Sequence, residues 1–318
     1  ILMVGLAIYL AASIVAMTAW NINVLIIARL FQALGGCAGL VLGRAIVRDT
    51  SGENDAARRL ALMNLMVTLG PGIAPMLGGF LAGSTGWRSI FILLCGLGVV
   101  NFVLTWRLLP ETGPSSSSSN GMVVRNYFQL LRSRAFLGFA IGGGCATTSM
   151  YAFVTAAPFI LVHELQRPLS EVGPCLAILI LGVWVGSMLA SRLIPVVPIK
   201  RLLIGANAIS VLAAFVLLAA VLAGHLSLAL AVGSMFVFTL GVGIASPAAL
   251  TEAISVNPAV VGSASGLYGF CQMAIGALCT TLVGLGESPA LAAAAVLAGA
   301  GIVAQTSFWI ASGSSPRR

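Results

Sequence analysis

Apolar segments of about 20 residues recur from one end of the chain to the other, and they constrain its fold more than any other feature. Each segment is long enough to cross the roughly 30 Å hydrocarbon core of a membrane as a helix. Charged residues make up only 8% of the 318 and hydrophobic residues 59%, whereas a soluble domain carries about 25% charged residues. The sequence therefore predicts an all-α, polytopic membrane protein rather than a soluble one.

Hydropathy read together with loop signals predicts ten transmembrane helices. They are placed near residues 1–20, 24–47, 60–83, 88–109, 136–160, 172–194, 202–223, 226–247, 259–285 and 289–311. The longest polar stretch, 110–134, contains a Ser/Gly/Pro-rich run that is typical of a flexible linker. It separates a four-helix part, 1–109, from a six-helix part, 135–312, which is followed by a tail at 313–318.

The net charge of +8 comes from basic residues in short loops between the apolar spans, which indicates membrane topology rather than nucleic-acid binding. With Arg29 inside a span, thirteen of the remaining lysines and arginines fall on one side of the predicted membrane. Only Arg88 and Arg167 fall on the other side. Because basic loops stay in the cytoplasm, the linker and the C-terminus are predicted to be cytoplasmic.

Several function classes lack the residues that they need. The six cysteines are scattered through apolar segments, without a CxxC pair or a histidine at ligand spacing, so no metal site is predicted. The sequence contains no HExxH, no GxSxG and no pair of intramembrane aspartates, so an intramembrane enzyme is not expected. A channel would show charge rings or a repeated filter sequence, and neither is visible.

Glycine and proline mark the helix packing. Gly35, Gly39 and Gly43 follow at four-residue spacing on one face of the second span, where small residues let helices approach closely. In the third span, LGPGIAPMLGG places two prolines one turn apart among glycines. Prolines remove backbone hydrogen bonds, so a bent or hinged helix is predicted there.

These segments together resemble the major facilitator superfamily and, within it, the Bcr/CflA group of drug exporters. RLFQALGGCAGLVLGRAIVRD (29–49) is similar to that group's fourth helix, with Arg29 and Gln32 in its Arg-x-x-Gln signature. The antiporter-type glycine–proline motif of the fifth helix corresponds to Gly70, Pro71, Pro75, Gly78 and Gly79. Further short motifs look like the ends of the sixth helix and parts of the seventh and eleventh.

The resemblance implies that the ten spans are helices three to twelve of a twelve-helix protein whose first two helices are missing. On this interpretation the fragment is expected to be inactive alone. The resemblance further implies a multi-pass protein of the bacterial inner membrane, acting as a monomer without a cofactor. It would export small drug-like molecules by proton antiport and alternating access. Import of a small metabolite on the same fold is the alternative.

Arg29 is the charged residue expected inside the membrane. It lies about six residues into its span, roughly 9 Å deep, where an unpaired charge costs at least ~2.5 kcal/mol. Either it faces the cavity and tunes a proton-carrying carboxylate or meets substrate, or it snorkels to the nearby interface. All eight acidic residues sit in loops or at span ends, so the proton acceptor of an antiporter is expected in the missing helices.

A substrate site near the midplane, between the two halves, would draw on polar or aromatic residues well inside the spans. The candidates are Asn64, Tyr151, Phe153, Phe238, Tyr268 and Gln272, together with Gln32, and packing roles fit each of them as well. Arg48 and Asp49 are candidates for a cytoplasmic gate, although a solvated cluster of loop charges explains them equally well.

Overall fold

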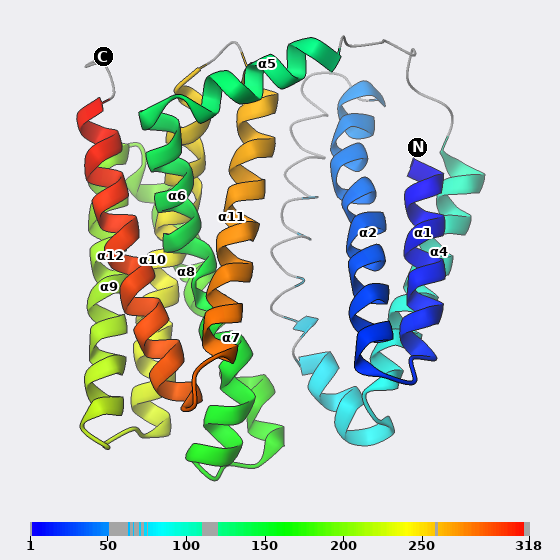
Figure 1. Cartoon of the computed structure of the whole chain (residues 1–318), viewed down its shortest axis with the longest axis horizontal. Coiled ribbons are helices and arrows are strands. Elements are labelled where there is room, and N and C mark those ends of the chain that lie inside the picture. Colours follow the sequence, from blue (N-terminus) through cyan, green and yellow to red (C-terminus); the bar gives the residue numbers. More distant parts are fainter. Residues whose placement is uncertain are drawn as a thin grey trace. The chain divides into compact units, whose positions relative to one another are not determined.

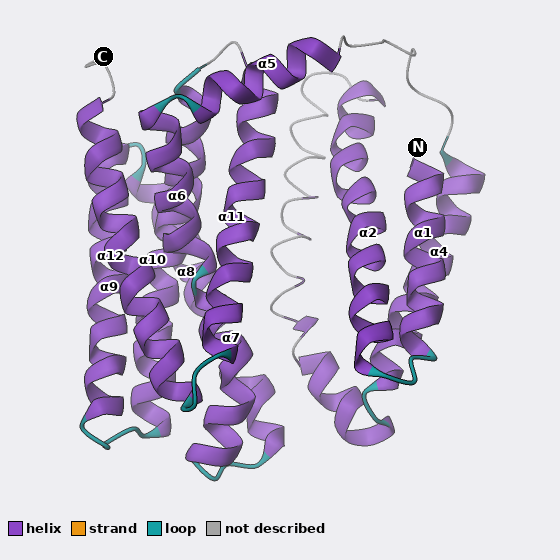
Figure 2. Cartoon of the chain, viewed as in Figure 1, coloured by secondary structure: helices purple, strands orange, loops and turns teal. Residues whose placement is uncertain are grey.

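A computed structural model describes residues 2–50, 63, 66, 70, 73–74, 76–109, 120–257 and 260–314. These residues form helices and connecting loops, with no strand among them (Figure 1, Figure 2). The predicted all-α fold is therefore confirmed. The chain divides into two compact units, Ile1–Ser116 and Ser117–Arg318, and each is described by itself.

In the first unit, α1 (Leu2–Met17) packs against both α2 (Ile22–Thr50) and α4 (Arg88–Leu108). Residues 76–85 are also helical. The α1–α2 crossing is close because Gly35 has no side chain: a Cβ there would lie 2.6 Å from the backbone nitrogen of Tyr9. Gly39 has nothing within 4 Å of such a position, whereas a Cβ on Gly43 would lie 3.3 Å from Cε of Met63. The predicted glycine face therefore makes close contacts at Gly35 and Gly43 and none at Gly39.

The second unit contains the longer series of helices. They are α5 (Asn120–Leu131), α6 (Arg134–Thr148), α7 (Met150–Phe159), the π-helix η1 (Ile160–Glu164), the 3-10 helix η2 (Leu169–Glu171), α8 (Val172–Leu193), α9 (Ile199–Leu222), α10 (Leu228–Ser255), α11 (Val261–Gly284) and α12 (Pro289–Ser314). α6 contacts α10, α11 and α12, while α10 contacts α8 and α9. α6 and α10 therefore form the centre of this unit, and both are rich in buried residues.

The span predicted at 136–160 is not one regular helix. α6 ends at Thr148 and α7 begins at Met150. Just before this break, Thr147 and Thr148 donate hydroxyl hydrogen bonds to the carbonyls of Gly143 (2.6 Å) and Gly144 (2.8 Å), and such back-bonding tends to bend helices. Pro158 lies inside α7. The five-residue π-turn η1 begins directly after the end of α7.

α10 continues through Pro247 to Ser255, although the sequence predicted that this span ends at 247. A proline leaves the carbonyl four residues earlier without its helical donor. Here that carbonyl belongs to Gly243, and the hydroxyl of Ser187 in α8 lies 3.4 Å from it and donates to it. Packing on α8 therefore allows α10 to continue past the proline.

Helices long and apolar enough to cross a membrane number eight among the described residues, and Leu2–Met17 is a shorter apolar helix. Within the span predicted at 60–83, residues 63, 66, 70, 73–74 and 76–83 are described, and all of them are helical. The chain is thus a multi-span helical protein, and the predicted number of ten stays a prediction. The segment predicted to be a linker, 110–134, contains α5, whose Leu130 is buried in the core.

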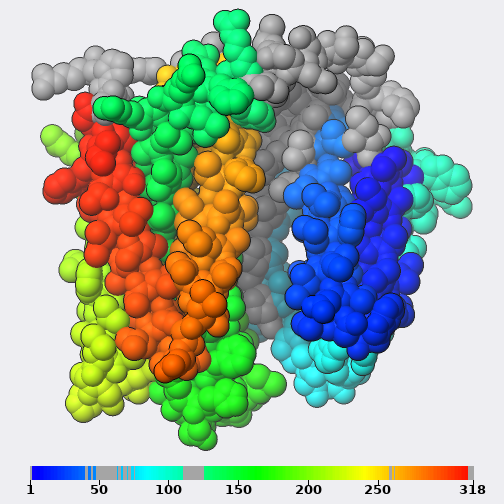
Figure 3. All heavy atoms as spheres, viewed as in Figure 1, coloured from blue at the N-terminus to red at the C-terminus, as the bar shows by residue number. Residues whose placement is uncertain are grey.

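α5 lies across the ends of α6 and α11 instead of running parallel to them (Figure 1), and it covers the end of α11 in the space-filling view (Figure 3). Ser133 follows α5 and caps α6, because its hydroxyl accepts a hydrogen bond from the backbone N–H of Phe136 (3.3 Å). The chain therefore turns sharply between the two helices.

Candidate functional site

The first unit contains a hydrogen-bonded polar chain between α1 and α2. The Arg29 guanidinium donates from Nη1 to Oε1 of Gln32 over 2.6 Å, as the i, i+3 spacing on one helix face allows. Gln32 donates in turn from Nε2 to Oγ of Ser13 (2.8 Å), and Ser13 donates to the carbonyl of Tyr9 (2.7 Å). Gln32 is 3% exposed and Ser13 is fully buried, so the guanidinium is hydrogen-bonded to a side chain that packing holds in place.

Arg29 itself is exposed, and its guanidinium carbon lies 5.9 Å from the ring centroid of Phe91 in α4. The ion pair found among the described residues joins Arg167 to Glu171 in the other unit, so no described carboxylate neutralises Arg29. A guanidinium carries five N–H donors, and Gln32 takes one of them. The remaining donors can hydrogen-bond an anionic or carbonyl-bearing group.

A second polar group joins α6 to α11 in the second unit. Gln272 donates from Nε2 to Oγ1 of Thr147 over 2.7 Å. The Thr148 hydroxyl shares its one proton between the carbonyl of Gly144 and the backbone carbonyl of Gln272, each 2.8 Å away. Tyr151 lies on the same seam, 3.3 Å from where a Cβ on Gly276 of α11 would be. We call Thr147, Thr148, Tyr151 and Gln272 the α6–α11 seam.

Tyr268 lies one turn before Gln272 and extends the seam toward α5. Its ring packs against Gly143 of α6, where any Cβ would collide with the phenol oxygen. Tyr268 is 3% exposed, and its hydroxyl has no hydrogen-bond partner among the described residues, nor has the buried hydroxyl of Ser149 at the α6–α7 break. Buried hydroxyl groups are ordinarily paired, so this seam has hydrogen-bonding capacity that the bundle itself does not use.

The structure thus brings Arg29 and Gln32 together in one unit, and Tyr151, Tyr268 and Gln272 together in the other. Phe153 and Phe238 lie elsewhere, in an apolar cluster formed with α8, α9 and α12, and are only 2% and 1% exposed. Their placement on a cavity wall stays a prediction, and Asn64 falls outside the described residues.

The two remaining predicted motifs are described only in part. Gly70, Gly78 and Gly79 are helical, and a Cβ on Gly78 would just touch Ile90 of α4. Pro71 and Pro75 lie outside the described residues. The backbones of Arg48 and Asp49 form the last turn of α2, but their side chains are not described, so their role as a gate stays a prediction.

Three partners in these networks were missed by the sequence analysis: Ser13, Thr147 and Thr148. A run of three hydroxyl residues, 147–149, inside an apolar span was the available signal for the seam. Ser13 gave a weaker signal, because a lone serine in a membrane helix commonly bonds its own backbone. No cluster of three metal-ligating side chains occurs within the described ranges.

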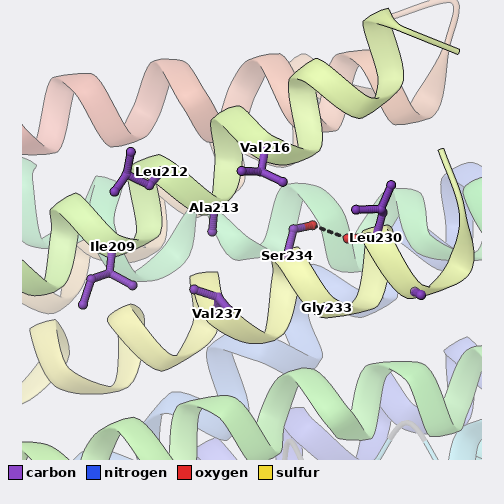
Figure 4. A pocket seen from close by; sticks show the side chains of 9 residues that line it. Ile209, Leu212, Ala213, Val216, Leu230, Gly233, Ser234 and Val237 are labelled. Atoms are coloured by element: carbon purple, nitrogen blue, oxygen red, sulfur yellow. Dashed lines mark hydrogen bonds between the residues drawn. The ribbon is translucent and has the colours of Figure 1, made fainter. Parts of the chain in front are cut away.

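An apolar groove of about 410 Å³ lies between α9 and α10 on the outside of the second unit (Figure 4). Its lining residues are Ile209, Leu212, Ala213, Val216, Ala229, Leu230, Gly233, Ser234 and Val237. Ser234 carries the hydroxyl group of this lining, and it already donates to the carbonyl of Leu230 over 2.6 Å. The groove offers hydrocarbon contact and little that would orient a polar ligand.

A family model described as Major Facilitator Superfamily matches residues 1–280. The chain is 29% identical over 299 residues to the uncharacterized MFS-type transporter YdgK of Bacillus subtilis, covering 91% of this chain and 73% of that protein. It is 26% identical over 258 residues to the bicyclomycin resistance protein homolog of Haemophilus influenzae, covering 80% and 65%. It is 27% identical over 190 residues to the multidrug transporter MdfA of Yersinia pestis, covering 57% and 46%.

Solved structures share the fold at low sequence identity. A bacterial homolog of the human lysosomal transporter Spinster, in an inward-facing and unoccupied conformation, superposes with a TM-score of 0.71 at 16% identity, covering 99% of this chain and 82% of that one. A D-xylose–proton symporter superposes with a TM-score of 0.71 at 14% identity, covering 97% and 79%.

Proposed function

Because the chain belongs to the Major Facilitator Superfamily, whose model matches residues 1–280, we propose that it exports small drug-like molecules in exchange for protons. The observation that carries the proposal is the similarity to relatives named as a bicyclomycin resistance protein homolog and as a multidrug transporter. Transport would proceed by alternating access, in which two bundles rock around a central site.

Arg29 has the coupling role in this proposal. Its guanidinium bonds to Gln32, three residues further from the start of α2, and this bond favours a position inside the membrane over snorkelling to the near end. Free guanidinium donors can lower the pKa of a carboxylic acid that approaches, or bind a polar group of the substrate. In the second unit, the α6–α11 seam would offer hydroxyl and amide groups to a polar substrate.

The charges at the two ends of the second unit support the proposed orientation. Arg125, Arg132, Arg134, Arg192, Lys200 and Arg201 lie at the end that carries α5, and Glu252 is the described acid near it. The opposite end carries Arg167, His163 and His225 with Glu164, Glu171 and Glu287. By the positive-inside rule, the α5 end and the C-terminus would face the cytoplasm of a bacterial inner membrane. The protein would act as a monomer, without a cofactor.

Drug susceptibility in an efflux-deficient bacterial host tests the function. The chain is expressed as it stands and with an N-terminal extension of the two helices that the superfamily resemblance implies. We expect resistance to amphiphilic drugs and dye efflux that a protonophore abolishes. If neither version lowers drug accumulation, export is wrong, and uptake of a metabolite in the same cells would instead favour import.

Arg29→Ala tests the coupling residue in whichever version is active. We expect proton-driven efflux to fall at least about tenfold, because roughly 1.4 kcal/mol of lost interaction already has that effect. Arg107→Ala is the matched control, since Arg107 is exposed in the last turn of α4 and has no recorded contact with the Arg29 network. Efflux that persists unchanged in Arg29→Ala would refute the coupling role without touching the proposed export.

A further inference from the structure

α5 is a helix with two different sides, and its inner side is fixed to the bundle. Leu130 is 1% exposed and belongs to the apolar cluster that contains Phe136 and Phe139 of α6. The hydroxyl of Tyr127 lies 3.7 Å from where a Cβ on Gly266 of α11 would be. These contacts set the rotation of α5 about its own axis.

The outer side of α5 combines cationic and apolar side chains. Phe128 is 62% exposed and Leu131 is 44% exposed, although both are large and apolar. Arg125 and Arg132 are exposed as well, and their separation of seven residues places them on one face, with Phe128 between them. The backbone N–H of Arg132 donates to the carbonyl of Phe128 (3.2 Å), so helical geometry extends to Arg132.

Neither arginine has an acceptor in the part of the chain that the structure describes. The ion pair recorded there lies at the opposite end of the unit, between Arg167 and Glu171. Arg134, Arg192 and Arg201 are exposed at the α5 end too, and they add to its positive potential. This end of the unit therefore attracts anions.

The position of α5 narrows the choice of anion. The helix lies across the ends of α6 and α11 (Figure 1), at the level where apolar spans give way to polar residues. An amphipathic helix at that level inserts its apolar side chains at the boundary between headgroups and acyl chains. Arginine side chains next to them reach the phosphates of anionic lipids.

We propose that the face of α5 formed by Arg125, Phe128, Leu131 and Arg132 binds the headgroups of anionic phospholipids at the membrane surface. Phe128 and Leu131 contact the upper acyl chains, while the two guanidinium groups hydrogen-bond the phosphate. The bound lipid holds α5, and with it the start of α6, at a fixed depth. The inference is independent of the substrate and of the transport direction, because it depends only on the bundle lying in a bilayer.

Equilibrium binding of a fluorescent phosphatidylglycerol to the full chain in neutral detergent tests the proposal. Arg125→Gln/Arg132→Gln is compared with Arg192→Gln/Arg201→Gln, which removes the same charge from exposed residues at the same end of the unit. We expect the α5 double variant to weaken phosphatidylglycerol binding about tenfold or more, because each of the two arginines contributes separately to binding at an anionic surface. The control pair is expected to weaken it less than about twofold.

Phe128→Ser provides a second variant that keeps all the charges, and it is also expected to weaken the binding of phosphatidylglycerol. If the two double variants lose phosphatidylglycerol binding equally, the binding comes from the general positive potential of this end, and the proposed site is wrong. No loss in the α5 pair would overturn it as well. Competition by inorganic phosphate as effective as that by phosphatidylglycerol would show an anion site without the lipid contact and would also contradict the proposal. Melting curves establish that each variant is folded.

Discussion

Gln32 of α2 donates a hydrogen bond from Nε2 to the Oγ of Ser13 in α1, over 2.8 Å. The same amide accepts from Arg29 through its oxygen, so a neutral side chain links a charged group to a neighbouring helix. The Ser13 hydroxyl donates in turn to the carbonyl of Tyr9. The position of the guanidinium thus depends on the packing of α1 against α2.

Gln32→Leu should destabilise the first unit, because it leaves the Arg29 guanidinium without its acceptor and Ser13 without its donor. A buried polar group that loses its partner costs about 1–3 kcal/mol. A double-mutant cycle with Ser13→Ala, read by chemical unfolding in detergent, should give a coupling energy of at least about 0.5 kcal/mol. Ser84→Ala is the control, because the Ser84 hydroxyl donates only within its own helix, to the carbonyl of Phe80. If the effects of Gln32→Leu and Ser13→Ala simply add, the hydrogen bond between Gln32 and Ser13 does not contribute to stability.

Thr148→Val should loosen α6 from α11. The substitution keeps the shape and removes the hydroxyl that donates to the carbonyl of Gln272, which in a membrane bundle is worth about 0.5–1.5 kcal/mol. Thr251→Val is a matched control, since Thr251 makes only the helical back-bond to Pro247 and is exposed. Equal unfolding free energies for the two variants would contradict the role of the seam.

Glu164→Ala should free the start of α12. Oε1 of Glu164 accepts from the backbone N–H of Ala290 (3.1 Å) and from the hydroxyl of Ser288 (3.5 Å), so it acts as a cap supplied by another helix. Losing such a cap costs about 0.5–2 kcal/mol. Amide hydrogen exchange at 290–292 should speed up in Glu164→Ala and stay near the native rate in Glu287→Ala. Unchanged exchange in Glu164→Ala would show that the cap contributes nothing.

Gly186→Leu should prevent α8 and α10 from crossing. Any Cβ at Gly186 collides with the carbonyl of Leu240 and lies 3.0 Å from Cα of Gly243. We expect little folded protein in membranes, judged by size-exclusion chromatography after solubilisation. Gly205→Ala should be tolerated or slightly stabilising, by up to about 1 kcal/mol, because nothing lies within 4 Å of its Cβ position. Normal yields of folded Gly186→Leu would mean that the two helices can separate at little cost.

Hydropathy predicted the regular spans well, since length and composition alone decide whether a segment can cross a membrane. The predicted span at 172–194 corresponds to α8 (Val172–Leu193), and that at 289–311 to α12 (Pro289–Ser314). Irregular features were harder to foresee, because they depend on neighbouring helices. Ser187 donates to the carbonyl that Pro247 leaves without its helical donor in α10, and this contact has no local signal. α5 was overlooked because a short amphipathic helix beside a serine run is not a span.

The candidate site was predictable to a similar degree. Arg29 and Gln32 are three residues apart, so helical geometry alone brings them together. Their hydrogen bond to Ser13 joins two helices, and the sequence alone does not show how far Ser13 of α1 lies from Gln32 of α2. Likewise, Tyr268 and Gln272 were identifiable as polar residues in a span, but their partners in α6 became known only from the packing.

The π-turn after Pro158 has a consequence for the direction of the side chains that follow it. A π-turn adds one residue to a helical turn, and one residue corresponds to about 100° of rotation about the helix axis. At the end of η1, where the chain leaves the helix, a side chain therefore points in a different direction from the one that an uninterrupted α-helix would give it. Glu164, the last residue of η1, meets the start of α12 in this rotated setting. A regular α-helix would direct this carboxylate elsewhere, so the cap that Glu164 provides for α12 depends on the π-turn after Pro158.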